Sequence, residues 1–295
     1  MRYMYYPGCS LHGTGKPYEE SLLAVLRQLG VQWQEIDDWN CCGATAYMSV
    51  NPRKAHALAS RNLALAEQQV SGEGGVDIMA PCSACYLVLS KAKKFLQADA
   101  NNGREILQTM DDVGLPYEDK VRVRHPLDIL VNDIGLEAVK EAVCESLGGM
   151  KVASYYGCQV VRPYATFDNA YNPMSMDHLM EAAGAVSLPW PVKTRCCGGS
   201  HMGTMQDVGM RLCYILLHEA KKYGAEAIVT ACPLCQFNLE CYQGEMSKRF
   251  GEDLSIPVVY FTQLLGKAMG IPDRELGMQR MFVALQPAES AAAKA

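Results

Sequence analysis

The sequence contains thirteen cysteines, and ten of them form two sets of five that run in the same order. Each set has a lone cysteine after a tyrosine-rich segment, an adjacent pair followed by glycine, and a Cys-x-x-Cys. The first set is Cys9, Cys41, Cys42, Cys82 and Cys85, and the second is Cys158, Cys196, Cys197, Cys232 and Cys235. The corresponding landmarks are 149, 155 and 150 residues apart (9 to 158, 41 to 196, 82 to 232). This doubled pattern predicts two related sites in a duplicated chain.

Five thiols in each set favour a polynuclear iron–sulfur cluster over a single metal ion. Structural zinc takes four ligands, and the diverging side chains of adjacent cysteines suit one small ion poorly. In a cluster, each thiolate can bind a different iron. Because a cubane cluster uses about four cysteines, a fifth predicts either a spare redox thiol or a cluster of another geometry. Zinc, and redox-active or buried free thiols, remain alternatives from spacing alone.

The elements around each set alternate between strand and helix patterns. In the first half, strands are expected at 2–6, 31–36 and 76–80, with helices at 17–29 and 52–70; residues 101–150 read as a helical linker. In the second half, strands are expected at 152–156, 185–188 and 227–230, with helices at 174–183 and 204–223. This alternation predicts an α/β protein of two pseudo-repeated, Rossmann-like βαβ modules with mostly parallel sheets. The cysteines follow the carboxyl ends of strands, the sheet edge where ligands collect in such folds.

The repeat also predicts the division of the chain. The first module with its helical linker is expected at 1–148 and the second at 149–286. Residues 287–295 read as a flexible tail.

Composition limits the classes of function. A net charge of −5 and a pI near 5.7 argue against a nucleic-acid surface. No apolar run reaches the roughly 18–20 residues that would span a bilayer. With no signal-peptide pattern at the start, a cytoplasmic location with reduced thiols is expected.

The ten cysteines resemble the tandem CCG-domain signature, and the chain from residue 1 to about 260 most resembles the B subunit of heterodisulfide reductase. The spacings carry the resemblance: 31 residues separate Cys9 from Cys41 and 39 separate Cys42 from Cys82, against 37 and 34 in the second set. The resemblance implies that each set of five binds one noncubane [4Fe-4S] cluster. It also implies a disulfide held between the two clusters and cleaved reductively, or the reverse thiol oxidation. The implied partners are a protein like the family's C subunit, with cubane [4Fe-4S] clusters, and a flavin-binding protein like its A subunit.

Outside the cysteines, the candidates are fewer. His12 and His201 are candidate proton donors at the first and second sites. Gln159, Lys193 and Arg195 are candidate substrate-binding residues, and Arg162 is a further one of the same kind. Gln159 stands where methanogen members of the family carry histidine, which favours a heterodisulfide-reductase-like complex of a bacterium or sulfur oxidiser. Cys144, Cys213 and Cys241 are expected to be helix or core cysteines.

Two other functions compete with disulfide chemistry. CCG-type subunits also accompany lactate, glycolate and succinate oxidation, where the clusters would only relay electrons and the chain would have no substrate of its own. A zinc-stabilised interaction protein is the third possibility.

Overall fold

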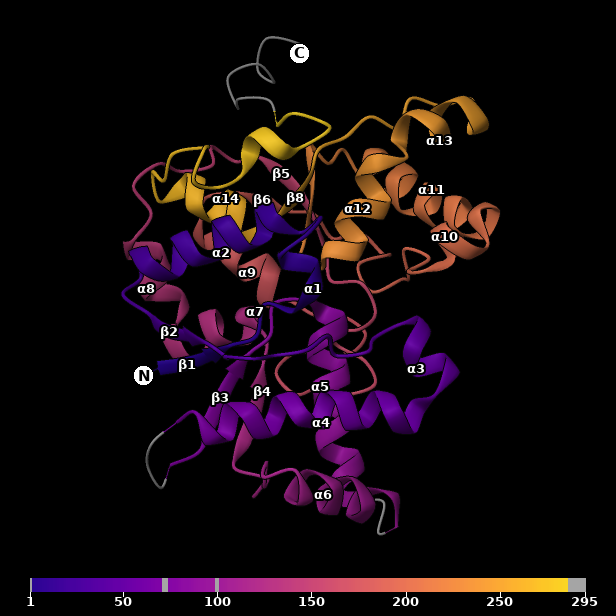
Figure 1. Cartoon of the computed structure of the whole chain (residues 1–295). Coiled ribbons are helices and arrows are strands. Elements are labelled where there is room, and N and C mark those ends of the chain that lie inside the picture. Colours follow the sequence, from indigo (N-terminus) through magenta and orange to yellow (C-terminus); the bar gives the residue numbers. More distant parts are fainter. Residues whose placement is uncertain (1, 71–73, 99–100, 286–295) are drawn as a thin grey trace. The chain divides into compact units, whose positions relative to one another are not determined.

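The computed structural model describes residues 2–70, 74–98 and 101–285 (Figure 1). The expected tail at 287–295 lies outside these residues. Within them, none of the helices combines the length and apolar character needed to cross a membrane.

The first repeat contains a four-stranded parallel sheet. Its strands are β1 (Arg2–Tyr5), β2 (Gln32–Glu35), β3 (Val76–Met79) and β4 (Val121–Arg124), in the order β2-β1-β3-β4. β1 pairs with β3 through Met4 opposite Ile78 and Tyr5 opposite Met79. The sequence placed 121–124 in a helical linker; this was wrong, because the short Val-Arg-Val-Arg alternation forms the edge strand beside β3.

The second repeat reproduces this sheet. Its strands are β5 (Lys151–Tyr155), β6 (Val186–Ser187), β7 (Ala227–Thr230) and β8 (Val258–Tyr260), in the order β6-β5-β7-β8. The central register is also repeated, since Ser154 lies opposite Val229 where Tyr5 lies opposite Met79 in the first sheet. The two parallel sheets confirm the expected α/β fold of two Rossmann-like modules.

Helices connect the strands in each repeat. In the first they are α1 (Gly8–Leu11), α2 (Lys16–Gln28), α3 (Ala46–Val50), α4 (Pro52–Gln68), α5 (Ser83–Ala98) and α6 (Asn102–Asp112), followed by α7 (Pro126–Asp128), a π-helix (Ile129–Ile134) and α8 (Leu136–Glu141). In the second they are α9 (Ser175–Ala182), α10 (His201–Thr204), α11 (Gln206–Lys222), α12 (Pro233–Cys241), α13 (Gln243–Phe250), α14 (Phe261–Ala268) and a 3₁₀ turn (Met278–Arg280). Asn51 caps α4 by accepting a hydrogen bond from the Lys54 N–H, as Asn before a helix commonly does.

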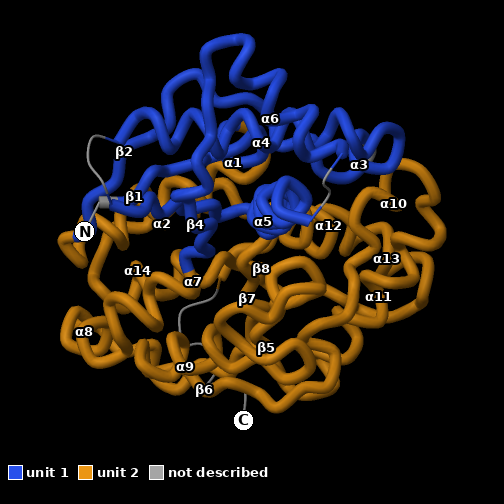
Figure 2. Tube along the Cα trace, turned by 90° about the horizontal axis from the view of Figure 1, so that it is seen from below, with its two compact units in different colours: residues 1–12, 31–126 blue, residues 13–30, 127–295 orange. Residues whose placement is uncertain are grey.

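The compact units do not follow the order of the chain. Unit 1 comprises residues 1–12 and 31–126, and unit 2 comprises 13–30 and 127–295 (Figure 2). The first-repeat helix α2 therefore belongs to the unit that holds the second sheet. The division at 148/149 stays a prediction about where one repeat ends and the next begins.

Helix α2 is held in unit 2 by its contacts with α14 and β8. The Tyr18 ring stacks on the Tyr260 ring with centroids 4.5 Å apart, and both side chains are buried. The hydroxyls of Ser21 and Thr262 are hydrogen-bonded at 2.6 Å. At the surface, the Arg280 guanidinium donates two hydrogen bonds to Glu20. Apolar burial, supported by one buried polar pair, thus fixes this helix.

We expect Tyr18→Ala to lower the free energy of unfolding by about 3–5 kcal/mol, because it removes a fully buried ring and leaves a cavity. Urea denaturation followed by circular dichroism measures the change. Tyr171→Ala, at an 85% exposed tyrosine of the same unit, is the control and should change stability by no more than about 0.5 kcal/mol. Equal effects of the two substitutions would contradict the packing described for α2.

Candidate iron–sulfur sites

In the first repeat, the fold brings the five cysteines of the first set together. Cys9 lies in α1 just after β1, the pair Cys41-Cys42 lies in the loop after β2, and Cys82 and Cys85 lie at the start of α5 after β3. The Sγ atoms of Cys9 and Cys41 are 3.8 Å apart, and those of Cys42 and Cys85 are 3.3 Å apart. Hydrogen bonds between Cys41 and Cys42, and between Cys82 and Cys85, complete a continuous group of thiols.

The second repeat builds the same group at the end of β5 and β7. The Sγ atoms of Cys197 and Cys235 are 3.4 Å apart, and Cys158 is hydrogen-bonded to Cys196. Cys232 precedes α12 and is hydrogen-bonded to Cys235 in the first turn of that helix. Chain segments distant in sequence therefore meet at the strand ends, as the parallel topology requires.

Each set combines buried and accessible thiols. Three in each are buried: Cys42, Cys82 and Cys85 in the first set, and Cys197, Cys232 and Cys235 in the second. The lone cysteine and the first of the pair are accessible, since Cys9, Cys41 and Cys196 are exposed and Cys158 is half-buried. A cluster bound to all five sulfurs would be buried on the side of the three buried thiols. It would be accessible to another molecule on the side of the other two.

The crowding perturbs the thiol pKa values in both sets. Hydrogen bonds from Cys41 and Cys85 lower the pKa of Cys42 to about 4. A hydrogen bond from Cys158 lowers the pKa of Cys196 to about 6. The pKa of Cys41 and that of Cys158 are raised because each thiol donates a hydrogen bond to the neighbouring sulfur and is partly buried. Thiolates packed this closely repel one another, and iron ions that each accept one sulfur relieve the repulsion.

A glycine makes each convergence possible. Gly8 and Gly157 precede the lone cysteine of their sets, with φ of +65° and +67°. A β-carbon on Gly8 would lie 2.9 Å from the Sγ of Cys85, and one on Gly157 would lie 3.2 Å from the Sγ of Cys235. The backbone of the lone cysteine can thus approach the last cysteine only where no side chain intervenes. The donor set and this space fit a sulfur-ligated cluster.

A tyrosine hydroxyl anchors each paired-cysteine loop. Tyr6 donates a hydrogen bond of 2.8 Å to the carbonyl of Asn40, and Tyr155 donates one of 2.7 Å to the carbonyl of Arg195. Both carbonyls belong to the residue just before the pair. The rings are buried, and burial beside the cysteines raises the pKa of both phenols. Sequence analysis did not single out these tyrosines; the available signal was their separation by 149 residues, the same offset as Cys9 and Cys158.

The two histidine candidates occupy different settings. His201 begins α10 and is exposed, and its charge helps to lower the pKa of Cys196. His12 is the C-cap residue of α1, with Nε2 3.8 Å from a Glu35 carboxylate oxygen and its ring 5.3 Å from that of Trp39. The structure therefore brings His201 within electrostatic reach of its cysteine set and places His12 against Glu35 and Trp39.

The three candidate substrate-binding residues also differ in burial and in their hydrogen-bond partners. Lys193 is only 5% exposed, and its ammonium donates hydrogen bonds to Asp177 at 3.0 Å and to the Pro173 carbonyl at 3.1 Å. Burial raises the pKa of Asp177, while hydrogen bonds from Tyr156 and Lys193 oppose that shift. Lys193 thus stabilises the start of α9 through these hydrogen bonds. Gln159 is half-buried beside Cys158, and Arg195 is exposed.

Arg195 lines a cavity of about 480 Å³ that reaches Cys196. Arg162 lines it from another segment and donates a hydrogen bond to the Thr194 carbonyl. Pro191, Leu212 and Ile215 form the apolar part of the cavity wall. The cavity therefore places two guanidinium groups beside an accessible thiol of the second set.

The remaining cysteines differ from one another. Cys213 is buried and donates from Sγ to the Cys197 carbonyl at 3.1 Å, so it supports the paired-cysteine loop. Cys241 is half-buried. Cys144 is exposed and lies outside the helices, contrary to the expected helix or core position. In the described part of the chain, no three His, Cys, Asp or Glu side chains are arranged to hold a single metal ion.

Comparison with known proteins identifies the repeated unit. The profile of the cysteine-rich domain (CCG) matches residues 3–90 and again 152–240. The chain is 32% identical over 283 residues to the 8-methylmenaquinol:fumarate reductase membrane anchor subunit of Wolinella succinogenes, covering 95% of this chain and 96% of that protein. It is 30% identical over 279 residues to the B subunit of the ferredoxin/F420H2-dependent CoB-CoM heterodisulfide reductase of Methanosarcina acetivorans, covering 92% and 91%.

A solved structure shares the fold. The crystal structure of a hypothetical protein from Helicobacter pylori aligns with 97% of this chain at a TM-score of 0.76 and 15% identity. The chain spans 52% of that protein's length. At this identity the likeness concerns the fold alone.

We expect Gly8→Ala to abolish iron binding at the first set while sparing the second, because the added methyl would meet the Cys85 sulfur and strain the backbone. Iron in the anaerobically purified protein should fall by roughly half, as expected when one of two similar clusters is lost. Gly30→Ala is the matched control, since Gly30 has φ of +68° but nothing within 4 Å of an added methyl. Full iron content in Gly8→Ala, or an equal loss in Gly30→Ala, would disprove this role of the glycine.

Proposed function

The chain is an iron–sulfur protein of the cysteine-rich domain (CCG) family, which includes the B subunit of heterodisulfide reductase, and from that premise we propose that it cleaves a disulfide or, in reverse, oxidises thiols. In this proposal two noncubane [4Fe-4S] clusters serve one substrate. The first is held by Cys9, Cys41, Cys42, Cys82 and Cys85, and the second by Cys158, Cys196, Cys197, Cys232 and Cys235. When bound, such clusters supply single electrons and iron with a high affinity for sulfur.

The observation that carries the proposal is the accessible thiol beside a cationic cavity at the second set. A centre that only passes electrons needs no cavity for a small molecule at its ligands. Here Cys196 opens onto about 480 Å³ lined by Arg162 and Arg195. Guanidinium groups bind carboxylates, sulfonates and phosphates, and the apolar wall suits the carbon chain of a thiol.

The reaction consumes two electrons and two protons for each disulfide, and it releases two thiols. Arg195 would hold an anionic group of the substrate, while Arg162, tied to the Thr194 carbonyl, keeps the loop in place. His201 is the titratable side chain whose charge acts on Cys196, so it is the residue we propose to deliver a proton at this set.

Electrons require partner proteins. The relatives named above are subunits of multisubunit reductases. We propose that the immediate electron donor resembles the family's C subunit and carries cubane [4Fe-4S] clusters. A flavin-binding protein like the family's A subunit would supply that donor in turn.

An electron relay is the second candidate. The similarity to a fumarate reductase subunit over 95% of the chain favours it. In that case the protein would pass electrons between partners of an oxidoreductase acting on lactate, glycolate, succinate or a similar acid, and the accessible side of each set would face another protein instead of a substrate.

Anaerobically purified protein should contain about eight iron atoms and about eight acid-labile sulfides per chain, the content of two [4Fe-4S] clusters. Iron analysis, sulfide analysis and electron paramagnetic resonance measure this. Adding a small anionic thiol to the oxidised protein should change the resonance spectrum if the clusters meet the substrate. An unchanged spectrum with full iron content would favour the relay, whereas stoichiometric zinc without iron would contradict both functions.

In the purified complex, Arg195→Gln should raise KM for an anionic disulfide by roughly tenfold, the loss expected from one charge-assisted hydrogen bond. The value of kcat and the iron content should stay near those of the wild type. Arg274→Gln, at an exposed arginine of the same unit, is the control. If both variants keep the wild-type KM, the cavity at Cys196 is not the substrate site.

A further inference from the structure

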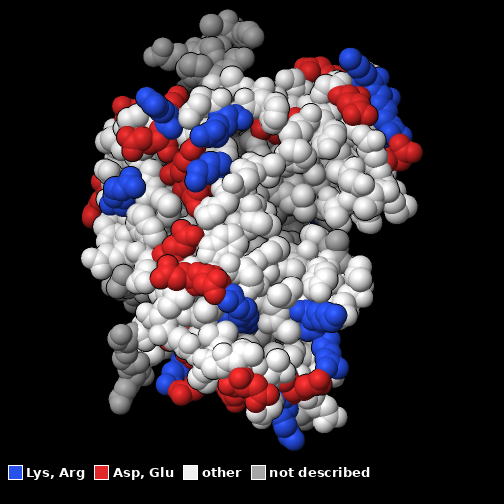
Figure 3. Space-filling model, viewed as in Figure 1, with Lys and Arg blue, Asp and Glu red and all other residues white. Residues whose placement is uncertain are grey.

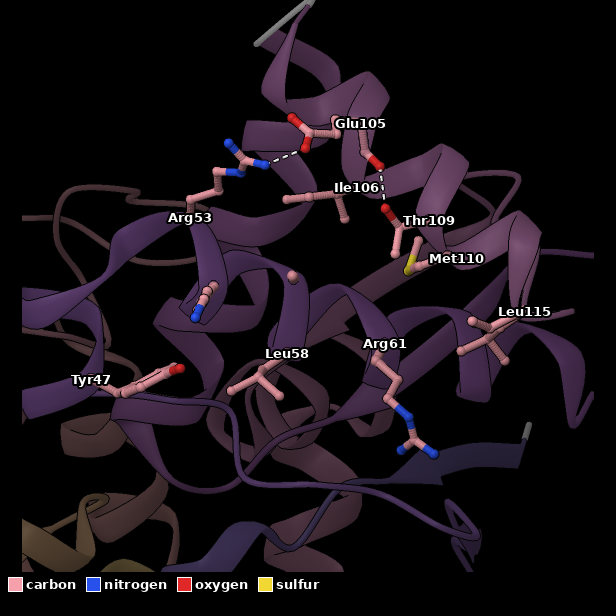
Figure 4. A pocket seen from close by; sticks show the side chains of 12 residues that line it. Tyr47, Arg53, Leu58, Arg61, Glu105, Ile106, Thr109, Met110 and Leu115 are labelled. Atoms are coloured by element: carbon pink, nitrogen blue, oxygen red, sulfur yellow. Dashed lines mark hydrogen bonds and ion pairs between the residues drawn. The ribbon is translucent and has the colours of Figure 1, made fainter.

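A second cavity lies in unit 1. It opens between α4 and α6 and has a volume of about 450 Å³. We call it the α4–α6 groove; its lining residues are Tyr47, Arg53, Lys54, Ala57, Leu58, Arg61, Glu105, Ile106, Thr109, Met110, Val113 and Leu115. Figure 4 shows Ile106, Met110 and Leu115 on one side of the space and Leu58 of α4 on the other. The groove is therefore apolar at its base.

Several large apolar side chains are left uncovered at this groove. Val113 is 73% exposed, Tyr47 is 40% exposed and Leu58 is 37% exposed. Beneath them, Ile106 and Met110 are buried in a small cluster with Ala64, so the groove is a continuation of packed core. Apolar side chains gathered around a cavity, with core beneath and charge around them, are typical of a protein-binding surface.

The rim of the α4–α6 groove is mainly basic. Arg53, Lys54 and Arg61 line it, against the single carboxylate of Glu105. Arg53 pairs with Glu105, as Figure 4 shows, and Arg61 pairs with Asp38 outside the groove. Figure 3 shows Lys and Arg side chains on the surface where α3 meets α4. The lining keeps an excess of positive charge in a chain whose net charge is −5.

The groove is continuous with the loop that carries Cys41 and Cys42. A β-carbon on Gly43, directly after the pair, would lie 3.4 Å from the Ala55 side chain of α4 and 3.5 Å from the Tyr47 ring. Tyr47 thus touches the paired-cysteine loop on one side and lines the groove on the other. A protein bound in the groove would be separated from the loop of Cys41 and Cys42 by the Tyr47 side chain.

We propose that the α4–α6 groove binds an amphipathic helix of the electron-transfer partner, with apolar residues on one face and carboxylates beside them. The apolar anchors would enter the cavity at helical spacing, and the carboxylates would meet Lys54 at the basic rim. This inference needs only that the chain works with a partner, and it holds for either function proposed above.

A small polar ligand fits the groove less well than such a helix. Its guanidinium groups are already paired at the rim, and the Thr109 hydroxyl donates to the Glu105 carbonyl within α6. Among the described residues, none of the lining side chains is a buried polar group that lacks a partner. The recognition available in the groove is therefore apolar contact with peripheral positive charge.

The test uses the affinity-tagged chain, purified anaerobically together with the proteins that assemble with it. Leu58→Glu and Lys54→Glu should each weaken retention of the electron-transfer partner by about tenfold or more, as hot-spot changes do. Lys54→Glu should not disturb α4, because a carboxylate in the first turn of a helix is favourable. Val208→Glu is the matched control, since Val208 is a 40% exposed helix residue of unit 2. Higher salt should weaken retention in the wild type.

Hydrogen exchange gives the second measurement. Amides at 53–61 and 105–113 should be protected in the complex relative to the free chain, and each variant should keep the iron content of the wild type. Wild-type retention in both groove variants, with no protection at these amides, would overturn the proposal. Protection caused by self-association of the isolated chain would also overturn it, because the occupant would then be a second copy.

Discussion

The close approach of one backbone to one sulfur is the constraint on which both cysteine sets depend. Five thiols gather only if the lone cysteine can come near the last one, and in each repeat a glycine at positive φ allows it: Gly8 against Cys85 and Gly157 against Cys235. Tyr6 and Tyr155 then hold the paired-cysteine loops through hydrogen bonds to backbone carbonyls, so no cysteine thiol is needed to position the loop. The parallel sheets deliver the segments, and these contacts determine how closely they converge.

The repeats are alike in their ligands and different in their surroundings. At the second set, Arg162 and Arg195 border an open cavity beside Cys196. At the first set, the paired-cysteine loop packs on α4, whose other face belongs to the α4–α6 groove. Duplication therefore supplied two equivalent sulfur sites, and the side chains around them differ in charge and accessibility. The small-molecule cavity thus adjoins the second set, and the proposed partner groove adjoins the paired-cysteine loop of the first.

The sequence was sufficient for the parallel α/β fold, because long apolar-periodic segments alternate with strands that follow turn signals. It was insufficient for β4 and β8: the first is half arginine and the second has only three residues, so neither gives a strong pattern. Lys193 was predicted as a substrate-binding residue, since its partner Asp177 lies sixteen residues away in the chain and becomes its neighbour only in the folded unit. Periodicity also predicted the helix at 17–29, although it could not say which helix would pack against it.

The destination of α2 has a consequence for any protein with a single repeat. The helix leaves the first strand of its own sheet and packs on α14, which follows the last strand of the other, while α9 of the second repeat packs with α8, which follows β4. The first repeat thus places α2 against a helix of the second repeat. A single repeat on its own would leave the apolar face of α2 exposed, so a protein with one repeat would need a second copy or another partner to cover that face.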